Sequence, residues 1–419
     1  MKSELLFRFT HLLWPLRQLV LLLLAASSAT AQSTTPPAIR ASIEKSLPLL
    51  TSSAVQSAER RSCFTCHHQA LPMLTLVEAR HQGFSIEETV LQDQVHHTTA
   101  HLQRGLENYL TGSGQGGRAD TAGSALWALE KTGYHRDPLT EAVASFLIRW
   151  NDDMPYWAPQ SDRPPTEGSR FTSTFLALRG LAGYGTENQQ EAIHKRRAAA
   201  RDWLVETPPV TTEDSVFRLQ ALVLAGASDH HRADAAQHLS RLQRDDGGWA
   251  QLPGADSDAY ATGSALVALH DAGETPIHSA VYIRGLQFLI QSQQADGSWH
   301  VVSRSVPIQD LYDSGFPHGK DQFISAAATA WATRALLRAS APPPKNTNPK
   351  PPPSAPFPPQ PTFIPPPPNT RLTRWPIFLA CAQLLHGSIH TGGRLSLGKL
   401  IVILEFAAQP GQFFLEASG

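Results

Sequence analysis

Two stretches of the sequence share one pattern: S-R-L-Q-R-D-D-G-G-W at 240–249 and R-G-L-Q-F-L-I-Q-S-Q-Q-A-D-G-S-W at 284–299. Each has a glutamine, a glycine four residues later and a tryptophan two residues after the glycine; these are Gln243, Gly247, Trp249, Gln293, Gly297 and Trp299. In both, an apolar helical run ends in a polar turn, where glycine can adopt a positive φ and the aromatic ring can anchor the returning chain. The pattern predicts a turn between packed helices.

Alanine-rich segments that end in glycine recur along the chain, at spacings of about 40–65 residues that suit helix pairs with loop insertions. They lie at 121–133, 171–183, 213–226 and 260–273. Partner helices are predicted between them, at 139–150, 191–205 and 233–242. Alternating helix pairs without strands predict an all-α fold, a toroid or solenoid in which each hairpin buries its apolar stripe against its neighbours.

The glutamine–glycine–tryptophan pattern resembles the repeat of the prenyltransferase/squalene oxidase repeat family, which includes the squalene-hopene cyclases. The block at 284–299 is the best match, and weaker copies extend the resemblance over residues 40–340. The resemblance implies a closed α/α toroid, for which the chain has room once, at 102–340. It also implies a hydrophobic ligand of isoprenoid or triterpenoid type. The zinc-binding pattern of the prenyltransferase β subunits is not evident, and no metal site is predicted.

The acid motif of the cyclases, Asp-x-Asp-Asp-Thr, can be compared with this sequence residue by residue. At 258–262 the chain reads D-A-Y-A-T, which places Tyr260 at the central acid. A neutral phenol cannot protonate an alkene or epoxide as a buried carboxylic acid can. We therefore expect no cyclised product from squalene. Asp258 is a catalytic candidate, and capping of the following helix is its alternative role.

A second polar cluster lies before the last predicted helix, in D-L-Y-D-S-G-F-P-H-G-K-D-Q-F at 310–323. Asp313, His318 and Asp321 bring two carboxyls and an imidazole to one loop, a combination suited to proton transfer. These three residues are further catalytic candidates. Capping of the helix that starts near Phe323 is the alternative role of Asp321.

Near the N-terminus, Cys63, Cys66 and His67 form C-x-x-C-H, the spacing at which haem c is attached covalently and its iron is bound by the histidine. Met73 is the cofactor-binding candidate for the other axial position. Histidines that could replace it there are His68, His96, His97 and His101. Three other interpretations stay open: a disulfide or redox pair, a Cys/His metal site, and chance spacing.

The ends of the chain differ from the repeats. Residues 1–31 combine basic residues, an apolar run and a small-residue cleavage site, which is typical of a secretory signal peptide; an uncleaved anchor is the alternative. We therefore expect export to the periplasm or the cell exterior. Residues 32–101 are a predicted N-terminal helical segment, 341–370 a disordered proline-rich linker, and 371–419 an unassigned tail.

The composition is that of a globular protein, with 41% hydrophobic and 17% charged residues and a net charge of -1. No long basic run suggests nucleic acid as a partner. Two functions remain: action on a hydrophobic isoprenoid in an aromatic-lined cavity of the toroid, or a non-catalytic scaffold that binds a hydrophobic molecule or a protein. Peripheral contact with a membrane stays open.

Overall fold

The computed structural model describes residues 34–306 and 311–340 of the 419. The chain divides into two units, Met1–Lys345 and Asn346–Gly419, and the second lies wholly outside the described residues. The predicted signal peptide at 1–31, the linker at 341–370 and the tail at 371–419 also lie outside them.

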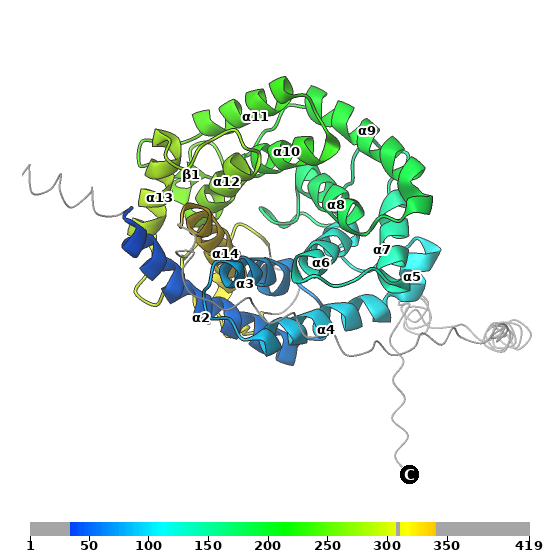
Figure 1. The fold of residues 1–419 in the computed structure, drawn as a ribbon, viewed down its shortest axis with the longest axis horizontal. Helices are drawn as coiled ribbons and strands as arrows, with labels where there is room; N and C mark the ends of the chain where they lie inside the picture. Colours follow the sequence, from blue (N-terminus) through cyan, green and yellow to red (C-terminus); the bar gives the residue numbers. More distant parts are fainter. Residues whose placement is uncertain (1–33, 307–310, 341–419) are drawn as a thin grey trace, which may run out of the picture. The chain divides into compact units, whose positions relative to one another are not determined.

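The described part of the first unit is a double ring of helices that alternate between an inner and an outer layer (Figure 1). The inner helices are α3 (Leu71–His81), α6 (Arg118–Thr132), α8 (Arg170–Tyr184), α10 (Thr212–Ala225), α12 (Ala259–Asp271) and α14 (Gln322–Ala339). The outer helices are α2 (Pro36–Arg60), α4 (Glu88–Arg104), α5 (Leu106–Thr111), α7 (Pro138–Arg149), α9 (Gln190–Glu206), α11 (Asp229–Arg241) and α13 (Ala280–Ser292). Shorter elements are η1 (Cys66–Ala70), η2 (Glu187–Gln189), η3 (Gly319–Asp321) and the antiparallel strands β1 (Trp249–Ala250) and β2 (Ser257–Asp258).

The ring is closed. Consecutive inner helices pack side by side, and α14 packs against α3 and against the outer helix α2. The predicted all-α toroid is confirmed, and it begins before the predicted boundary at residue 102 because α2 and α3 belong to it. None of the described helices has the length and apolar character needed to cross a bilayer.

Small residues allow the inner helices to approach one another closely. A Cβ added at Gly263 in α12 would lie 2.6 Å from the backbone nitrogen of Ala332 in α14, so only glycine fits at this contact. Every side chain from Ile324 to Leu337 in α14 is buried. Such a helix, covered on all sides, is expected where neighbouring inner helices and the outer layer both pack on it.

The tryptophans of the repeated pattern tie an outer helix to the next inner helix. The Trp299 indole Nε1 donates a hydrogen bond to the Leu289 carbonyl oxygen at 2.8 Å, and its backbone N–H donates to the Thr329 hydroxyl at 3.1 Å. The ring is buried. Trp249 makes the equivalent contacts with Leu239 and Thr262.

The glutamine and glycine of the second block close the outer layer. Gln293 Nε2 donates to the carbonyl oxygens of Gly297 at 3.0 Å and Ser42 at 2.9 Å. Gly297 has a φ of +93°, and a Cβ there would lie 2.3 Å from the Lys45 carbonyl oxygen. Because Ser42 and Lys45 belong to α2, this block holds the first outer helix against the end of the last one. Gln243 makes the same contacts in the first block, with Gly247 and with Val281 of α13.

A third copy of the pattern is hidden in the connection between α7 and α8. Trp157 Nε1 donates to the Leu147 carbonyl oxygen at 2.7 Å, and its backbone N–H donates to the Thr174 hydroxyl at 3.1 Å. Instead of a glutamine, the Arg196 guanidinium stacks on the indole at 3.9 Å and donates to the Asn151 carbonyl oxygen at 2.9 Å. The tryptophan contacts persist without the glutamine and glycine that make the pattern visible in the sequence.

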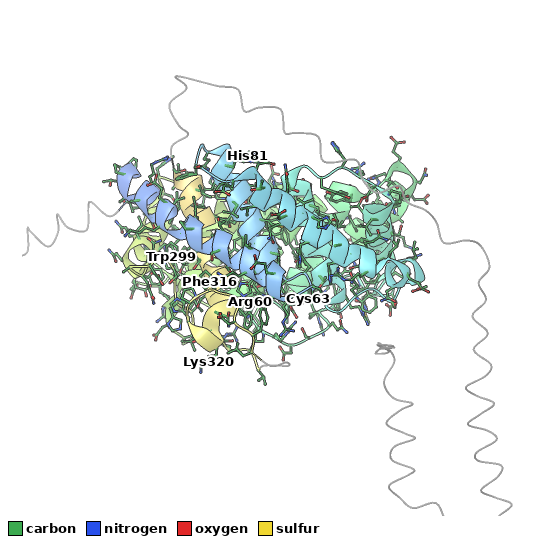
Figure 2. All side chains as sticks on the ribbon, turned by 90° about the horizontal axis from the view of Figure 1, so that it is seen from below. Arg60, Cys63, His81, Trp299, Phe316 and Lys320 are labelled. Carbon is green, nitrogen blue, oxygen red and sulfur yellow. The ribbon has the colours of Figure 1, made fainter. Side chains whose placement is uncertain are left out.

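The two ends of the ring differ. The longest connections, before α3, α8, α12 and α14, each precede an inner helix, so they gather where the inner helices begin. We call this the entrance end; it comprises residues 61–70, 150–169, 242–258, 293–306 and 311–321. Figure 2 shows Arg60, Cys63 and Lys320 at this end and His81, the last residue of α3, at the opposite end.

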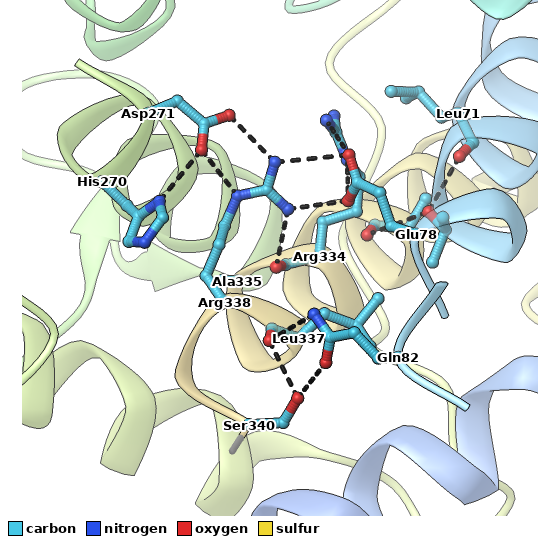
Figure 3. Close-up of polar contacts among 12 residues, drawn as sticks. Leu71, Glu78, Gln82, His270, Asp271, Arg334, Ala335, Leu337, Arg338 and Ser340 are labelled. Atoms are coloured by element: carbon cyan, nitrogen blue, oxygen red, sulfur yellow. Dashed lines mark hydrogen bonds and ion pairs between the residues drawn. The ribbon is translucent and has the colours of Figure 1, made fainter. Parts of the chain in front are cut away.

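The opposite end is held by a partly buried ion-pair network that joins α3, α12 and α14 (Figure 3). Glu78 pairs with Arg334 at 2.8 Å and with Arg338 at 2.7 Å, and Arg338 pairs with Asp271 at 2.8 Å. Burial acts to raise the pKa of Glu78, but the two guanidiniums outweigh burial and hold the pKa at about 2. The charged carboxylate therefore links the first inner helix to the last.

Candidate functional site

A cavity of about 160 Å³ lies at the entrance end. Its apolar wall is formed by Pro164, Pro165, Val306, Leu311, Phe323 and Ile324. Its polar wall is formed by His67, Arg163, Thr166, Glu167, Ser303, Ser305 and Lys320. A largely apolar wall with a few polar groups is typical of small-molecule sites.

The volume of the cavity limits what it can hold. An engineered cavity of about 150 Å³ in another protein binds benzene. This cavity, of about 160 Å³, therefore accommodates a molecule or a group of that scale. A whole triterpene, which is several times larger, does not fit unless the wall moves.

The centre of the ring, further along the inner helices, is filled with aromatic side chains that we call the aromatic core. Trp127 packs on Phe175 with ring centroids 5.3 Å apart, Phe175 on Phe217 at 5.2 Å, and Phe217 on Trp331 at 6.2 Å. The Arg334 guanidinium lies 5.2 Å from the Trp127 ring and 4.6 Å from the Trp331 ring. The aromatic surface expected to line a ligand cavity instead packs on itself and on a fixed cation.

Glu213, in the first turn of α10, is a buried acid at the entrance end. Its Oε1 accepts hydrogen bonds from the Thr172 hydroxyl at 2.9 Å and the Tyr260 hydroxyl at 3.3 Å, whereas its Oε2 has no partner among the described residues. Burial raises the pKa of Glu213 to about 8. The side chain is therefore protonated at neutral pH and can donate a proton or a hydrogen bond.

Asp120, in the first turn of α6, is a second buried acid. Ser173 lies next to it, but no hydrogen bond of normal geometry reaches either carboxyl oxygen within the described part of the chain. Burial raises the pKa of Asp120 to about 8. Arg163 and Glu167, an ion pair in the cavity wall, lie close to Asp120. Neither Asp120 nor Glu213 is itself part of that wall.

The candidates predicted from the sequence include neither acid. The comparison with the cyclase acid motif used the helix start at 258–262, whereas T-T-E-D-S at 211–215 places Glu213 at the central position of the same motif. The similarity of segment 211–215 to the acid motif could therefore have identified Glu213 from the sequence. Asp120 stands in R-A-D-T-A at 118–122, which resembles no acid motif, and burial alone makes it unusual.

The predicted candidate Asp258 caps a helix. Its side chain accepts a hydrogen bond from the Ala261 N–H at 3.0 Å at the start of α12, which is its alternative role in the sequence analysis. Burial raises its pKa. The Tyr260 hydroxyl donates a hydrogen bond to Glu213 Oε1, so the residue at the central acid position contacts an acid from the neighbouring inner helix.

The three loop candidates lie apart from the buried acids. Asp313 is 76% exposed. His318 Nε2 lies 2.9 Å from the Ser298 hydroxyl, and Asp321 Oδ2 lies 3.0 Å from His300 Nε2. These contacts hold the loop in place, and none of the three candidates belongs to the cavity wall. None of the three makes a hydrogen bond or ion pair with Asp258 among the described residues.

The C-x-x-C-H segment lies at the entrance end and leads into η1. Cys63 is exposed, Cys66 is partly exposed, and both are free thiols. His67 belongs to the cavity wall, and its ring centroid lies 4.8 Å from that of His68 and 5.1 Å from that of Phe323. Burial lowers the pKa of His67 to about 4, so the imidazole is neutral. Within residues 34–306 and 311–340, no group of three His, Cys, Asp or Glu side chains could hold a metal ion.

The residues around this segment do not fit a haem as they are arranged. The cavity beside His67 matches one benzene ring rather than a porphyrin. Met73 is fully buried and its sulfur accepts a hydrogen bond from the Thr98 hydroxyl at 3.8 Å. His97 Nε2 lies 3.2 Å from the Cys63 carbonyl oxygen. Neither Met73 nor His97 belongs to the cavity wall, so neither of these two candidate ligands faces His67 across it. Haem c remains a prediction from the sequence.

We expect the protein, produced together with haem-attachment machinery, to retain no covalent haem, because the cavity beside His67 is too small. The measurement is the visible absorption spectrum after denaturation and acid extraction, with the intact mass as a second readout. Colour that survives extraction, and that Cys66→Ser removes, would contradict this expectation and would require the entrance end to rearrange around the haem.

Comparison with known proteins shows similarity to terpenoid cyclases. Residues 170–347 match the family model of the squalene-hopene cyclase C-terminal domain. Over 108 residues the chain is 33% identical to lanosterol synthase ERG7 of Saccharomyces cerevisiae and 35% identical to lanosterol synthase erg7A of Aspergillus fumigatus. These matches cover 26% of this chain but only 14% and 13% of the two relatives.

Among solved structures, the type II terpene cyclase MstE from Scytonema aligns with 13% sequence identity and a TM-score of 0.40, covering 72% of this chain and 99% of that one. Helix order, ring closure and the repeated tryptophan contacts come from this chain alone. The protein is thus an all-α toroid whose residues 170–347 are similar to the squalene-hopene cyclase C-terminal domain.

Proposed function

We propose that this protein binds an isoprenoid-type molecule at the entrance end and transfers a proton to one of its double bonds, with Glu213 as the donor. The observation that carries the proposal is a buried carboxylic acid that is neutral at pH 7 and has one oxygen free of partners among the described residues. Protonation gives a carbocation, and loss of another proton returns an alkene. Solvent then reprotonates Glu213, so that the proton balance closes.

The size and lining of the cavity support a short isoprenoid, or one end of a longer chain. The apolar wall, which includes Val306, Leu311 and Phe323, suits a branched hydrocarbon. The similarity of residues 170–347 to a cyclase domain supports the same ligand class. The fixed cation Arg334 beside the aromatic core argues against a carbocation moving deep into the ring, so that double-bond migration is favoured over cyclisation.

A non-catalytic binding protein is the second candidate function. It is favoured because Glu213 is not part of the cavity wall, which is held together where the Ser305 hydroxyl donates to the Pro164 carbonyl oxygen at 2.7 Å. In this alternative the cavity holds a small apolar group of a ligand or of a partner protein, and no proton reaches it. Movement of segments 163–167 and 303–306 distinguishes the two candidates, since only catalysis requires it.

The proposal includes the location of the protein in the cell and the route by which the ligand enters. The signal-like residues 1–31 support export to the periplasm or the cell exterior. Val302, Val306 and Leu311, exposed by 62%, 75% and 55%, place apolar side chains at and beside the cavity. They support entry of the ligand from an apolar phase such as a membrane surface.

Glu213→Gln is expected to reduce solvent deuterium incorporation by about 10²–10⁴-fold, because glutamine cannot supply an acid proton. The protein is incubated in D₂O with a short prenyl alcohol, and with squalene in a parallel sample. Deuterium in recovered alkenes is measured by mass spectrometry. Incorporation by the wild type should also decline as pH rises through about 8, where Glu213 loses its proton.

Asp313→Asn is the matched control, because this carboxyl is exposed and belongs to no part of the cavity wall. Its rate should equal that of the wild type. Wild-type protein that incorporates no deuterium, or a Glu213→Gln variant as fast as wild type, would remove Glu213 from the chemistry and leave the non-catalytic candidate.

A further inference from the structure

Two hydroxyl groups from neighbouring inner helices hold Glu213. The Thr172 hydroxyl of α8 lies 2.9 Å from Oε1, and the Tyr260 hydroxyl of α12 lies 3.3 Å from the same atom. The second oxygen, Oε2, is buried and has no partner among the described residues. The two oxygens of the Glu213 carboxyl group therefore differ: Oε1 accepts two hydrogen bonds, and Oε2 accepts none from the described residues.

We propose that Thr172 and Tyr260 are positioning residues that keep Oε1 of Glu213 as a hydrogen-bond acceptor and thereby place its acid proton on Oε2. A protonated carboxyl has a single O–H group, and an oxygen that accepts two hydrogen bonds is the carbonyl oxygen of the acid. The inference rests on the proposed role of Glu213 as a proton donor. Tyr260, which stands at the central acid position of the motif, would then position the proton of Glu213 rather than supply a proton itself.

The direction of the hydrogen bonds follows from what else the hydroxyls can reach. Neither Thr172 nor Tyr260 has another side-chain hydrogen bond within the described residues, so Oε1 is the acceptor available to each. Burial and the neighbouring Glu213 raise the pKa of Tyr260 well above its ordinary value. Tyr260 therefore keeps its proton and remains a donor at every pH at which Glu213 titrates.

The charged groups that face Glu213 do not fix its proton. Asp214 follows it in α10, and its carboxyl accepts hydrogen bonds from Ser169 at 2.6 Å and from Thr211. Arg304, from the segment before the gap at 307–310, donates to Gln251 at 2.7 Å. Asp214 raises the pKa of Glu213 and Arg304 lowers it, but neither makes a hydrogen bond to its carboxyl. The two hydroxyls are the groups that distinguish Oε1 from Oε2.

The proposal has a consequence of definite sign. Hydrogen bonds donated to Oε1 also stabilise the ionised form, so removing either hydroxyl should raise the pKa of Glu213. The infrared spectrum of the neutral acid reports which oxygen carries the proton. If Oε1 is the carbonyl oxygen, loss of either hydroxyl removes an accepted hydrogen bond and raises the C=O stretching frequency. If Oε1 carries the proton, the carbonyl oxygen is Oε2, which has no partner among the described residues, and its frequency stays nearly unchanged.

The test is a pH titration of the Glu213 carboxyl by infrared spectroscopy of the full-length protein labelled with ¹³C-glutamate. The Glu213 band is assigned by its absence in Glu213→Gln. In Tyr260→Phe and in Thr172→Val we expect the pKa to rise by about 1 pH unit, a tenfold change in the acid dissociation constant. Thr172→Ser keeps the hydroxyl and should leave the pKa unchanged. This pair also preserves the test if Tyr260→Phe does not fold.

An unchanged or lowered pKa in Thr172→Val and in Tyr260→Phe would overturn the proposal. A rise in Thr172→Val that Thr172→Ser does not show supports it, because a general loosening of the ring would affect both variants. The titration needs no substrate. A protein that shows the expected pKa changes but incorporates no deuterium would therefore refute the proposed activity while leaving the positioning role intact.

Discussion

Trp299→Ala is expected to lower the free energy of unfolding by about 3–5 kcal/mol. The indole is 1% exposed and joins α13 to α14 through hydrogen bonds to Leu289 and Thr329. Truncation leaves a cavity between the two helices and removes the shorter of two side-chain hydrogen bonds to the Leu289 carbonyl oxygen, which keeps the Ser292 hydroxyl at 3.3 Å. The substitution also weakens the contacts of this turn with α2, since Gln293 and Gly297, which contact α2, lie in the same turn as Trp299. The measurement is equilibrium urea denaturation followed by circular dichroism.

Two variants separate packing from the hydrogen bond. Trp299→Phe fills most of the volume but lacks the N–H group, so a smaller loss of about 0.5–1.5 kcal/mol is expected from the lost hydrogen bond, since the Ser292 hydroxyl still donates to the Leu289 carbonyl oxygen. Val302→Ala changes a side chain that is 62% exposed in the same connection, and its effect should stay within about 0.5 kcal/mol. A denaturation midpoint for Trp299→Ala that equals that of the wild type would show that the ring does not depend on this anchor.

The fold could be predicted because its strongest signals are local. Gln293, Gly297 and Trp299 lie within one turn, and their spacing reflects contacts that the turn makes with α13 and the start of the next inner helix. The contact of this turn with α2, more than 250 residues earlier, leaves no trace in the local pattern. The sequence therefore predicts a toroid without showing where it closes or that it begins at α2.

The site was less predictable because it is assembled from separate helices. Glu213, Thr172 and Tyr260 come from three inner helices, and each has an ordinary alternative role at a helix start. Burial turns Glu213 into a neutral acid, and burial is a property of the assembled ring. Tyr260 illustrates the point: comparison with the motif places it at the central acid position, but nothing in the local sequence indicates its contact with an acid from the preceding repeat.

The cofactor and loop candidates show that a clear local motif does not reveal which distant residues surround it in the fold. Cys63, Cys66 and His67 form a compact motif with a definite chemical meaning, yet the space beside His67 depends on Phe323 and on segment 163–167. Motif spacing contains no information on such distant neighbours. Asp321 likewise belongs to a reactive-looking loop, but its carboxyl is occupied by His300 and by the backbone N–H of Ser303.

Glu78→Gln is expected to lower the free energy of unfolding at pH 7 by about 3–5 kcal/mol, because it leaves buried guanidinium charge uncompensated. Arg334 is 2% exposed and has Glu78 as its ion-pair partner among the described residues. Arg338 keeps Asp271, so the loss falls mainly on Arg334 and on the link between α3 and α14 (Figure 3). Urea denaturation at constant ionic strength measures the change.

Glu44→Gln is the matched control, because it removes a carboxylate from an exposed pair within one helix, with Arg40. An exposed pair of this kind contributes at most about 1 kcal/mol, so the control should stay close to the wild type. If the two variants were equally stable, the Glu78 network at the end opposite the entrance end would contribute no more than an ordinary surface ion pair.

The dependence on pH gives a second test of the Glu78 network. The pKa of Glu78 in the folded protein is about 2, below its ordinary value of 4.5, so its contribution to stability is complete above about pH 4.5 and is lost as pH falls through 2. The difference in unfolding free energy between wild type and Glu78→Gln should therefore shrink steadily from pH 5 to pH 2, because protonated glutamate resembles glutamine. A difference that stays constant over this range would mean that the loss arises from packing around α3 rather than from the charge that joins it to α14.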